Sequence, residues 1–242
     1  MDFKIINANI LDVTAEAVVL PANTALKEGS GVSTVIFEAA RRKKLEKACS
    51  EFGYCQVGSA VPTRAFNYDA KFIIHTVVPR WIDGEHDEYE LLSAAYLSAL
   101  NAADKMGCES IAFPLLSSGN NGFDLELAFE IAVSSIKSFK GEMLKKVILV
   151  IYGRKTALMV KNLGYTFETL PEGIKKLKKS ILKEEIQKIR EAKVKAAAEK
   201  ILQDQMNKAV DFLKDENNRR KLVDAGFNIA QKVIQLKKMA MR

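Results

Sequence analysis

A strand that runs into a loop of small residues is the feature of this sequence that most constrains its fold. Residues 110–113 form an apolar run that predicts a buried strand, and residues 114–123 are rich in Ser, Gly and Asn. A helix is expected to begin near Asp124, directly after this loop. A junction of this kind leaves backbone N–H groups unpaired at the positive end of a helix. The stretch therefore predicts an anion-binding site.

The same arrangement occurs a second time, upstream. Residues 20–23 (Leu-Pro-Ala-Asn) end an apolar strand, and residues 28–32 (Glu-Gly-Ser-Gly-Val) form a loop with two glycines. An apolar helix follows at residues 35–40. Two such loops in one α/β domain can hold the two phosphates of a diphosphate ligand, and we expect the rest of the fold to bring them together.

Strand and helix patterns alternate over the first 169 residues, which predicts an α/β fold with a mixed, mostly parallel sheet between helices. The run at residues 17–20 is continuously apolar, as in a central strand that is covered on both faces. The expected strands are residues 3–6, 17–20, 57–63, 72–77, 110–113, 146–152 and 165–169, and the expected helices are residues 33–50, 89–106, 125–139 and 156–162.

Composition excludes several classes of protein. The hydrophobic content of 48% is ample for a buried core. Three cysteines are too few for a disulfide framework, and no Cys/His cluster has the spacing of a zinc site. No stretch approaches the ~20 apolar residues that span a bilayer, and the first residues lack the basic start and apolar run of a signal peptide. We expect a cytoplasmic protein with no metal and no membrane contact.

The positive charge is concentrated after Pro171. The net charge of the chain is +7, and residues 171–242 contain 19 Lys or Arg against 10 Asp or Glu. Apolar residues recur there at helical spacing, which predicts an all-helical extension over residues 170–242. Its charged face is either a solvated surface or a site for a protein partner or self-association. Nucleic acid is disfavoured as a partner because this segment has no Tyr or Trp for base stacking.

Four motifs resemble, in the same order, the sequence hallmarks of macro domains, which are modules that bind ADP-ribose and in some cases remove it from proteins. The motifs are residues 17–23 (Ala-Val-Val-Leu-Pro-Ala-Asn), 29–32 (Gly-Ser-Gly-Val), 72–79 (Phe-Ile-Ile-His-Thr-Val-Val-Pro) and 110–119 (Ser-Ile-Ala-Phe-Pro-Leu-Leu-Ser-Ser-Gly). The resemblance implies a three-layer α/β/α macro domain over residues 1–169, followed by the helical extension. It also implies ADP-ribose or ADP-ribosylated protein as the ligand, without a cofactor.

The resemblance implies that both loops contact the phosphates. Glu28 and Ser30 stand where the family's first loop commonly has glycine, and Asn120 and Asn121 stand where an apolar and an aromatic residue are common in the second. Asparagine tolerates left-handed backbone geometry, so the second turn is still expected to form. The implied ligand-binding residues of the loops are Gly29, Ser30, Gly31, Val32, Ser117, Ser118, Gly119, Asn120, Asn121, Gly122 and Phe123.

The adenine end is expected at two other strand ends. The resemblance implies that Asn9 takes the place of an aspartate that accepts a hydrogen bond from the adenine amino group, and Asp12 is the alternative. Tyr152 stands where an aromatic side chain often packs on the adenine, although a tyrosine at a strand end also commonly packs at a rim.

The resemblance makes Asn23 the catalytic candidate, because the matching asparagine contacts the distal ribose. The alternative is a turn residue that bonds its own backbone. Hydrolases of the family commonly have an acidic residue where this chain has Ser33. Of the nearby carboxylates, Glu28 is expected to be a solvated loop charge and Asp124 a helix N-cap.

Three functions stay open on the sequence. One is ADP-ribose binding with hydrolysis of mono-ADP-ribosyl bonds by water that the substrate itself helps to activate. The second is a reader without catalysis, and the third is a basic protein associated with nucleic acid. Of the two histidines, His75 is expected to pack in the core and His86 to be solvated, while Arg80 and Trp81 are expected at the rim of the cleft.

Overall fold

The computed structural model describes residues 1–173, 187–197, 199–200, 203–204, 207–208, 211 and 214–216. The chain divides into two units, Met1–Lys176 and Leu177–Arg242, and each is considered by itself. The described residues of the second unit are helical except residue 215, which lies in a bend. From residue 174 on, the other residues of the extension that was predicted to be all-helical lie outside the described residues.

A seven-stranded sheet forms the centre of the first unit, with the strand order β3-β4-β2-β5-β6-β1-β7. All neighbouring strands run parallel except β3, which pairs antiparallel with β4. The prediction of a mixed, mostly parallel sheet is confirmed. The strands are β1 (Asp2–Asn7), β2 (Ala17–Ala22), β3 (Ala60–Arg64), β4 (Phe72–Val77), β5 (Ser110–Pro114), β6 (Lys146–Ile151) and β7 (Glu168–Thr169).

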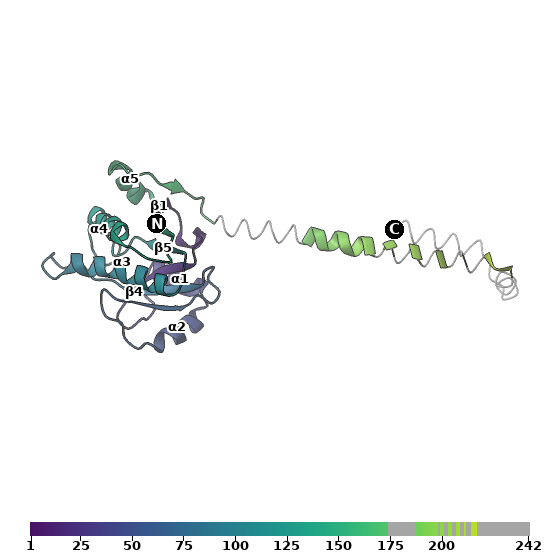
Figure 1. Cartoon of the computed structure of the whole chain (residues 1–242), viewed down its shortest axis with the longest axis horizontal. Coiled ribbons are helices and arrows are strands. Elements are labelled where there is room, and N and C mark those ends of the chain that lie inside the picture. The colour runs from purple at the N-terminus through teal and green to yellow at the C-terminus, as the bar shows by residue number, and fades with distance from the viewer. Residues whose placement is uncertain are drawn as a thin grey trace. The chain divides into compact units, whose positions relative to one another are not determined.

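Helices cover both faces of the sheet, which confirms the three-layer prediction (Figure 1). Helices α3 (Glu88–Lys105), α4 (Leu125–Ser138) and α5 (Arg154–Asn162) pack on one face, and α1 (Val32–Ala39) and α2 (Arg42–Ser50) pack on the other. Strand β2 shows why: Ala17 and Val19 belong to the first core, whereas Val18 and Leu20 belong to the second. Side chains alternate between faces along a strand, so a continuously apolar strand needs both layers.

The single helix expected at residues 33–50 is wrong, because the chain breaks it into α1 and α2 at Arg41. This residue adopts a left-handed conformation with φ of 70°. Left-handed geometry costs a residue other than glycine about 1–2 kcal/mol. The turn lets Phe37 of α1 and Leu45 of α2 both become fully buried on the same face of the sheet, and burial of two large apolar side chains exceeds that cost.

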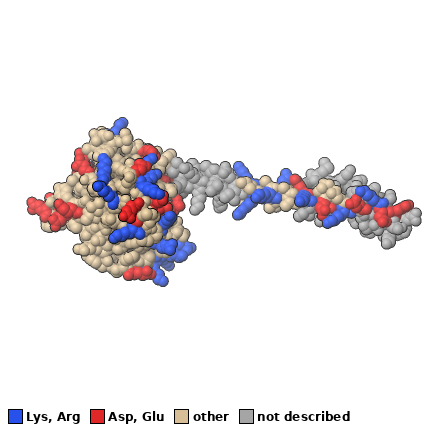
Figure 2. Space-filling model, viewed as in Figure 1, with Lys and Arg blue, Asp and Glu red and all other residues tan. Residues whose placement is uncertain are grey.

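Charged side chains lie on the surface of the first unit, and the three cysteines lie in its interior. Basic and acidic side chains are interspersed on the face of the first unit that Figure 2 shows. Cys49, Cys55 and Cys108 are buried free thiols. Among the described residues, no helix has the length and apolar character that crossing a bilayer requires.

Candidate functional site

A cleft of about 720 Å³ opens where β2, β4 and β5 end. These strands are parallel, so their carboxyl ends meet at one edge of the sheet, the usual place for a ligand in an open α/β fold. Both predicted loops reach this cleft. The residues that line it are Pro21, Ala22, Asn23, Thr24, Gly29, Ser30, Gly31, Val32, Ser33, Val57, Val77, Val78, Pro79, Arg80, Leu115, Ser117, Ser118, Gly119, Asn120 and Asn121.

The first loop ends at the amino terminus of α1. Gly31 precedes the helix with φ of 63°, a conformation that glycine adopts without strain. Gly31 is the N-cap, so Ser33 lies in the first turn of α1, where its hydroxyl accepts a hydrogen bond from the Gly29 N–H at 2.9 Å. The N–H groups of residues 30–33 donate to no described residue. They are the free donors that a helix amino terminus offers to an anion.

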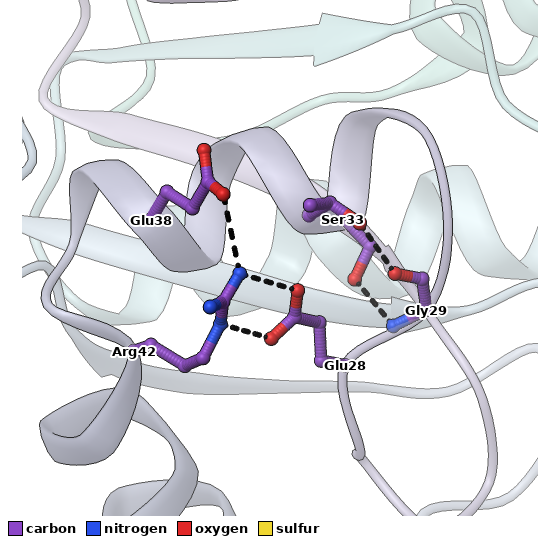
Figure 3. Close-up of polar contacts among 6 residues, drawn as sticks. Glu28, Gly29, Ser33, Glu38 and Arg42 are labelled. Carbon is purple, nitrogen blue, oxygen red and sulfur yellow. Dashed lines mark hydrogen bonds and ion pairs between the residues drawn. The ribbon is translucent and has the colours of Figure 1, made fainter.

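An ion pair fixes the outer side of the first loop (Figure 3). The Arg42 guanidinium donates to both carboxylate oxygens of Glu28, at 2.5 and 3.0 Å, and also to Glu38 at 3.3 Å. This two-point geometry is the strong form of an arginine–carboxylate contact. Glu28 is therefore held toward α2 and does not line the cleft.

Free backbone donors lie in the second loop itself, whereas the Asp124 carboxylate caps the amino terminus of the helix that follows. Ser117 has φ of 59° and donates its hydroxyl to the Pro79 carbonyl, and Ser118 donates its hydroxyl to the Leu115 carbonyl. The N–H groups of residues 118–121 donate to no described residue. A Cβ atom added at Gly119 would meet no atom within 4 Å, so this position faces open space.

The two loops are joined by a hydrogen bond across 90 residues of sequence. The Asn120 side-chain N–H donates to the Ser30 hydroxyl at 2.8 Å. Both residues are positions at which the sequence departs from the resembled family, and the two departures meet. We call this hydrogen bond the loop latch.

Asn23 lines the cleft, but its side chain also bonds its own turn. The amide N–H donates to the Lys27 carbonyl at 2.8 Å, and the amide oxygen accepts from the Lys27 N–H at 3.1 Å. The turn interpretation is thus present in the structure. A second amide N–H and a second lone pair remain for a ligand, so a contact with a ribose stays a prediction.

Asn9 and Tyr152 lie together at the ends of β1 and β6, where they line a separate pocket of about 440 Å³. The Asn9 side-chain oxygen accepts a hydrogen bond from the Leu11 N–H at 3.0 Å. Asp12, the alternative, is buried and accepts from the Gly173 N–H at 2.8 Å. Asn9 lines this pocket and Asp12 does not, and a contact with an adenine stays a prediction.

No carboxylate belongs to the described lining of the cleft. Glu28 is paired with Arg42, and the Asp124 carboxylate accepts the Glu126 and Leu127 N–H groups as the N-cap of α4. The cleft therefore offers backbone donors and neutral side chains, an arrangement suited to binding an anion more than to general-base catalysis.

The two histidines do not take part in the cleft. His75 is fully buried, its Nε2 lies 2.9 Å from the Thr63 hydroxyl, and burial lowers its pKa to about 4. His86 is exposed, and its hydrogen bond with the Asp83 carboxylate raises the pKa of His86. Asp83, His86 and Glu88 lie close enough to suggest a metal site, but the Glu88 carboxylate accepts four backbone N–H groups, from Ile82 to His86. These four hydrogen bonds account for the position of the Glu88 carboxylate beside Asp83 and His86 without a metal ion.

The cleft unites most of the predicted site residues and leaves some outside. Asn23, residues 29–32 and residues 117–121 line it together. Gly122 and Phe123 are not in the lining, and Phe123 is buried against Trp81. Val57, in the turn before β3, and Val78, directly after β4, line the cleft but were not predicted, because apolar residues carry no sequence signal of a site. Arg80 lines the cleft, whereas Trp81, which was expected beside it, does not and packs against Tyr89 and Phe123.

Comparison with known proteins agrees with this geometry. The family model described as "Macro domain" matches residues 19–132. A macro domain-containing protein of Chlorobaculum tepidum is 40% identical over 149 residues, which are 61% of this chain and 86% of that protein. A protein of Escherichia fergusonii named O-acetyl-ADP-ribose deacetylase is 42% identical over 139 residues, 56% of this chain and 78% of that protein.

Solved structures give the same result. A mutant Oceanobacillus iheyensis macrodomain with ADPR has a TM-score of 0.61 and 29% identity, and the match covers 65% of this chain and 89% of that one. A Trypanosoma brucei macrodomain in complex with ADP-ribose also has a TM-score of 0.61, with 26% identity over 67% of this chain and 69% of that one. The chain belongs to the macro domain family, as the four motifs predicted.

Proposed function

We propose that this chain binds ADP-ribose, free or attached to a protein, in the cleft between residues 29–33 and 117–121. The observation that carries the proposal is the pair of facing loops in which the N–H groups of residues 30–33 and 118–121 have no described acceptor. A diphosphate between them would accept hydrogen bonds from both loops at once. The relatives with ADP-ribose in their names or titles support the same ligand.

The parts of the ligand follow from the strand order. The diphosphate would lie at the loop after β5, the adenine toward Asn9 and Tyr152 at the ends of β1 and β6, and the distal ribose toward Asn23 at the end of β2. Tyr152 is 65% exposed, so its ring is available for stacking on a base.

Gly119→Glu tests the phosphate site. The added side chain would enter the open space at this position and place a negative charge where a phosphate would lie. We expect ADP-ribose affinity to fall by roughly 100-fold or more, an electrostatic and steric loss of about 3 kcal/mol. Isothermal titration calorimetry measures it, with adenosine as the ligand that lacks the diphosphate and is expected to bind more weakly.

Gly119→Ala is the matched control, because it adds a side chain without charge and should change affinity much less. Circular dichroism establishes that each variant is folded. A folded Gly119→Glu protein that binds ADP-ribose like the parent would show that the second loop is not the phosphate site.

The second part of the proposal concerns hydrolysis of the bond between ADP-ribose and a modified protein. We infer that any release of ADP-ribose from a modified protein proceeds by water attack assisted by the ligand's own phosphate and ribose, because the described cleft lining contains no carboxylate. The deacetylase names of relatives support an enzyme, whereas the lack of a carboxylate supports the alternative of a reader. A protein partner or self-association through residues 170–242 stays a prediction from the sequence.

A further inference from the structure

We propose that Arg80 is a specificity determinant that binds acidic side chains next to the ADP-ribosylated residue of a protein. This inference rests on the proposed function and adds the class of protein that would carry the ligand. It starts from charge: among the described residues that line the cleft, Arg80 alone has a charged side chain. Arg80 is exposed, and no described carboxylate forms an ion pair with it.

Strand order places Arg80 at the ribose end of the ligand. The carboxyl ends of the parallel strands lie side by side in the order β4, β2, β5, β6, β1. Arg80 follows β4, Asn23 follows β2 and Tyr152 follows β6. An ADP-ribose whose adenine lies toward Tyr152 and whose diphosphate lies at the loop after β5 therefore has its terminal ribose toward Asn23. Arg80 comes next in the series, where whatever is attached to that ribose must leave the cleft.

The backbone on both sides of Arg80 is held in place. The Pro79 carbonyl accepts the Ser117 hydroxyl at 3.1 Å, and the Trp81 N–H donates to the Asn121 carbonyl at 2.8 Å. Beyond Trp81, the Glu88 carboxylate gathers the N–H groups of the following turn. The Arg80 side chain therefore extends from a backbone that is already held beside the cleft, so binding does not have to order that backbone as well.

The chemistry of arginine selects the partner. A guanidinium binds a carboxylate through two parallel hydrogen bonds. The diphosphate already has the N–H groups of two loops, so a cation one strand beyond Asn23 is better placed for carboxylates outside the ADP-ribose itself. Aspartate and glutamate near the modified residue of a protein supply such groups.

The test uses the 242-residue chain and three ligands. They are free ADP-ribose, a peptide that carries ADP-ribose through a non-hydrolysable bond and is flanked by Glu and Asp, and the same peptide with Gln and Asn in place of Glu and Asp. We expect the parent to bind the acidic peptide about fivefold more tightly than the neutral one, as for a single exposed charge contact. Arg80→Ala should remove this preference, Arg80→Lys should retain part of it, and both should bind free ADP-ribose like the parent. The preference should weaken as salt rises.

Arg64→Ala is the matched control. Arg64 is also an exposed arginine, but it pairs with Phe72 at the start of β4 and so lies at the opposite edge of the sheet. It should leave all three affinities unchanged. Equal losses for Arg80→Ala with all three ligands would mean that Arg80 binds the diphosphate and would overturn the proposal. A parent without preference for the acidic peptide would overturn it too, while the function proposed above would stand if free ADP-ribose binds. A parent protein that binds no ADP-ribose would overturn both the Arg80 proposal and the proposed function.

Discussion

Ser33 illustrates how one residue can change what a cleft is able to do. Its hydroxyl is 2.9 Å from the Gly29 N–H and is buried with only 3% of the residue exposed. It therefore braces the first loop and cannot remove a proton from water as a carboxylate would. Asn23 is the other polar side chain with a candidate role, and it is exposed in the cleft.

Asn23→Ala and Ser33→Ala separate these roles. If the chain releases ADP-ribose from modified protein, Asn23→Ala should slow the single-turnover release at saturating enzyme by roughly tenfold or more, because water and ribose lose a positioning contact. Ser33→Ala should weaken binding, because the Gly29 N–H loses its acceptor, but should leave the saturated rate nearly unchanged. Affinity for ADP-ribose is measured first for both variants.

Loss of the saturated rate in Ser33→Ala alone would contradict this assignment. Ser33→Asp supplies the carboxylate and should raise the rate, by up to the roughly 10²–10⁴-fold that general-base assistance provides. If neither the parent nor Ser33→Asp releases ADP-ribose from any linkage, the hypothesis of a non-catalytic reader replaces the hypothesis of a hydrolase.

The loop latch is the element-scale feature that we expect to control access to the cleft. The bond from Asn120 to Ser30 closes one loop on the other, so a ligand that lies beneath it needs the bond to open before it enters or leaves. We predict that Ser30→Ala and Asn120→Ala each increase both the association and the dissociation rate of ADP-ribose about two- to tenfold, as for loss of one hydrogen bond. Stopped-flow binding measures both rates.

The double variant decides whether the latch acts as a pair. Its rates should match those of either single variant, because the second substitution removes no further contact. Ser118→Ala is the control, since its hydroxyl bonds Leu115 within its own loop. Additive effects of the two substitutions would contradict the latch.

The elements that depend on local patterns were predictable, and those that depend on contacts across the chain were not. The apolar runs of β2 and β5 and the loop after β5 are visible in the sequence because burial imposes a short-range pattern. The break at Arg41 was missed because Lys and Arg favour helix, and tertiary packing overrides that preference. Neither the Arg42–Glu28 ion pair nor the loop latch could be predicted, since no periodic pattern records which loop residues meet.

At the scale of the whole molecule, His75 makes the stability of the first unit depend on pH. Burial lowers its pKa to about 4 in the folded protein, against an ordinary value of 6.5. The unfolded chain therefore takes up the proton first as pH falls. The contribution of neutral His75 is complete above about pH 6.5 and is lost as pH falls toward 4, by on the order of 3 kcal/mol in the free energy of unfolding.

Urea titrations followed by circular dichroism at pH 7 and pH 4 test this dependence. His75→Gln cannot titrate and should show a smaller loss of stability between the two pH values than the parent. His86→Gln is the control: the pKa of His86 is raised by Asp83, so its contribution has the opposite sign, and the exposed position makes it small. A parent and a His75→Gln variant with the same pH dependence would contradict the assignment.

The surroundings of Trp81 have a practical consequence. It is the single tryptophan of the chain. Its backbone N–H donates to the Asn121 carbonyl of the second loop, and its indole packs edge-on against Phe123 and Tyr89. Indole emission responds to the polarity and motion of its neighbours, and here those neighbours include the loop that a phosphate would order. We therefore expect a shift in Trp81 emission when the cleft is occupied, which would make ligand binding measurable without a label.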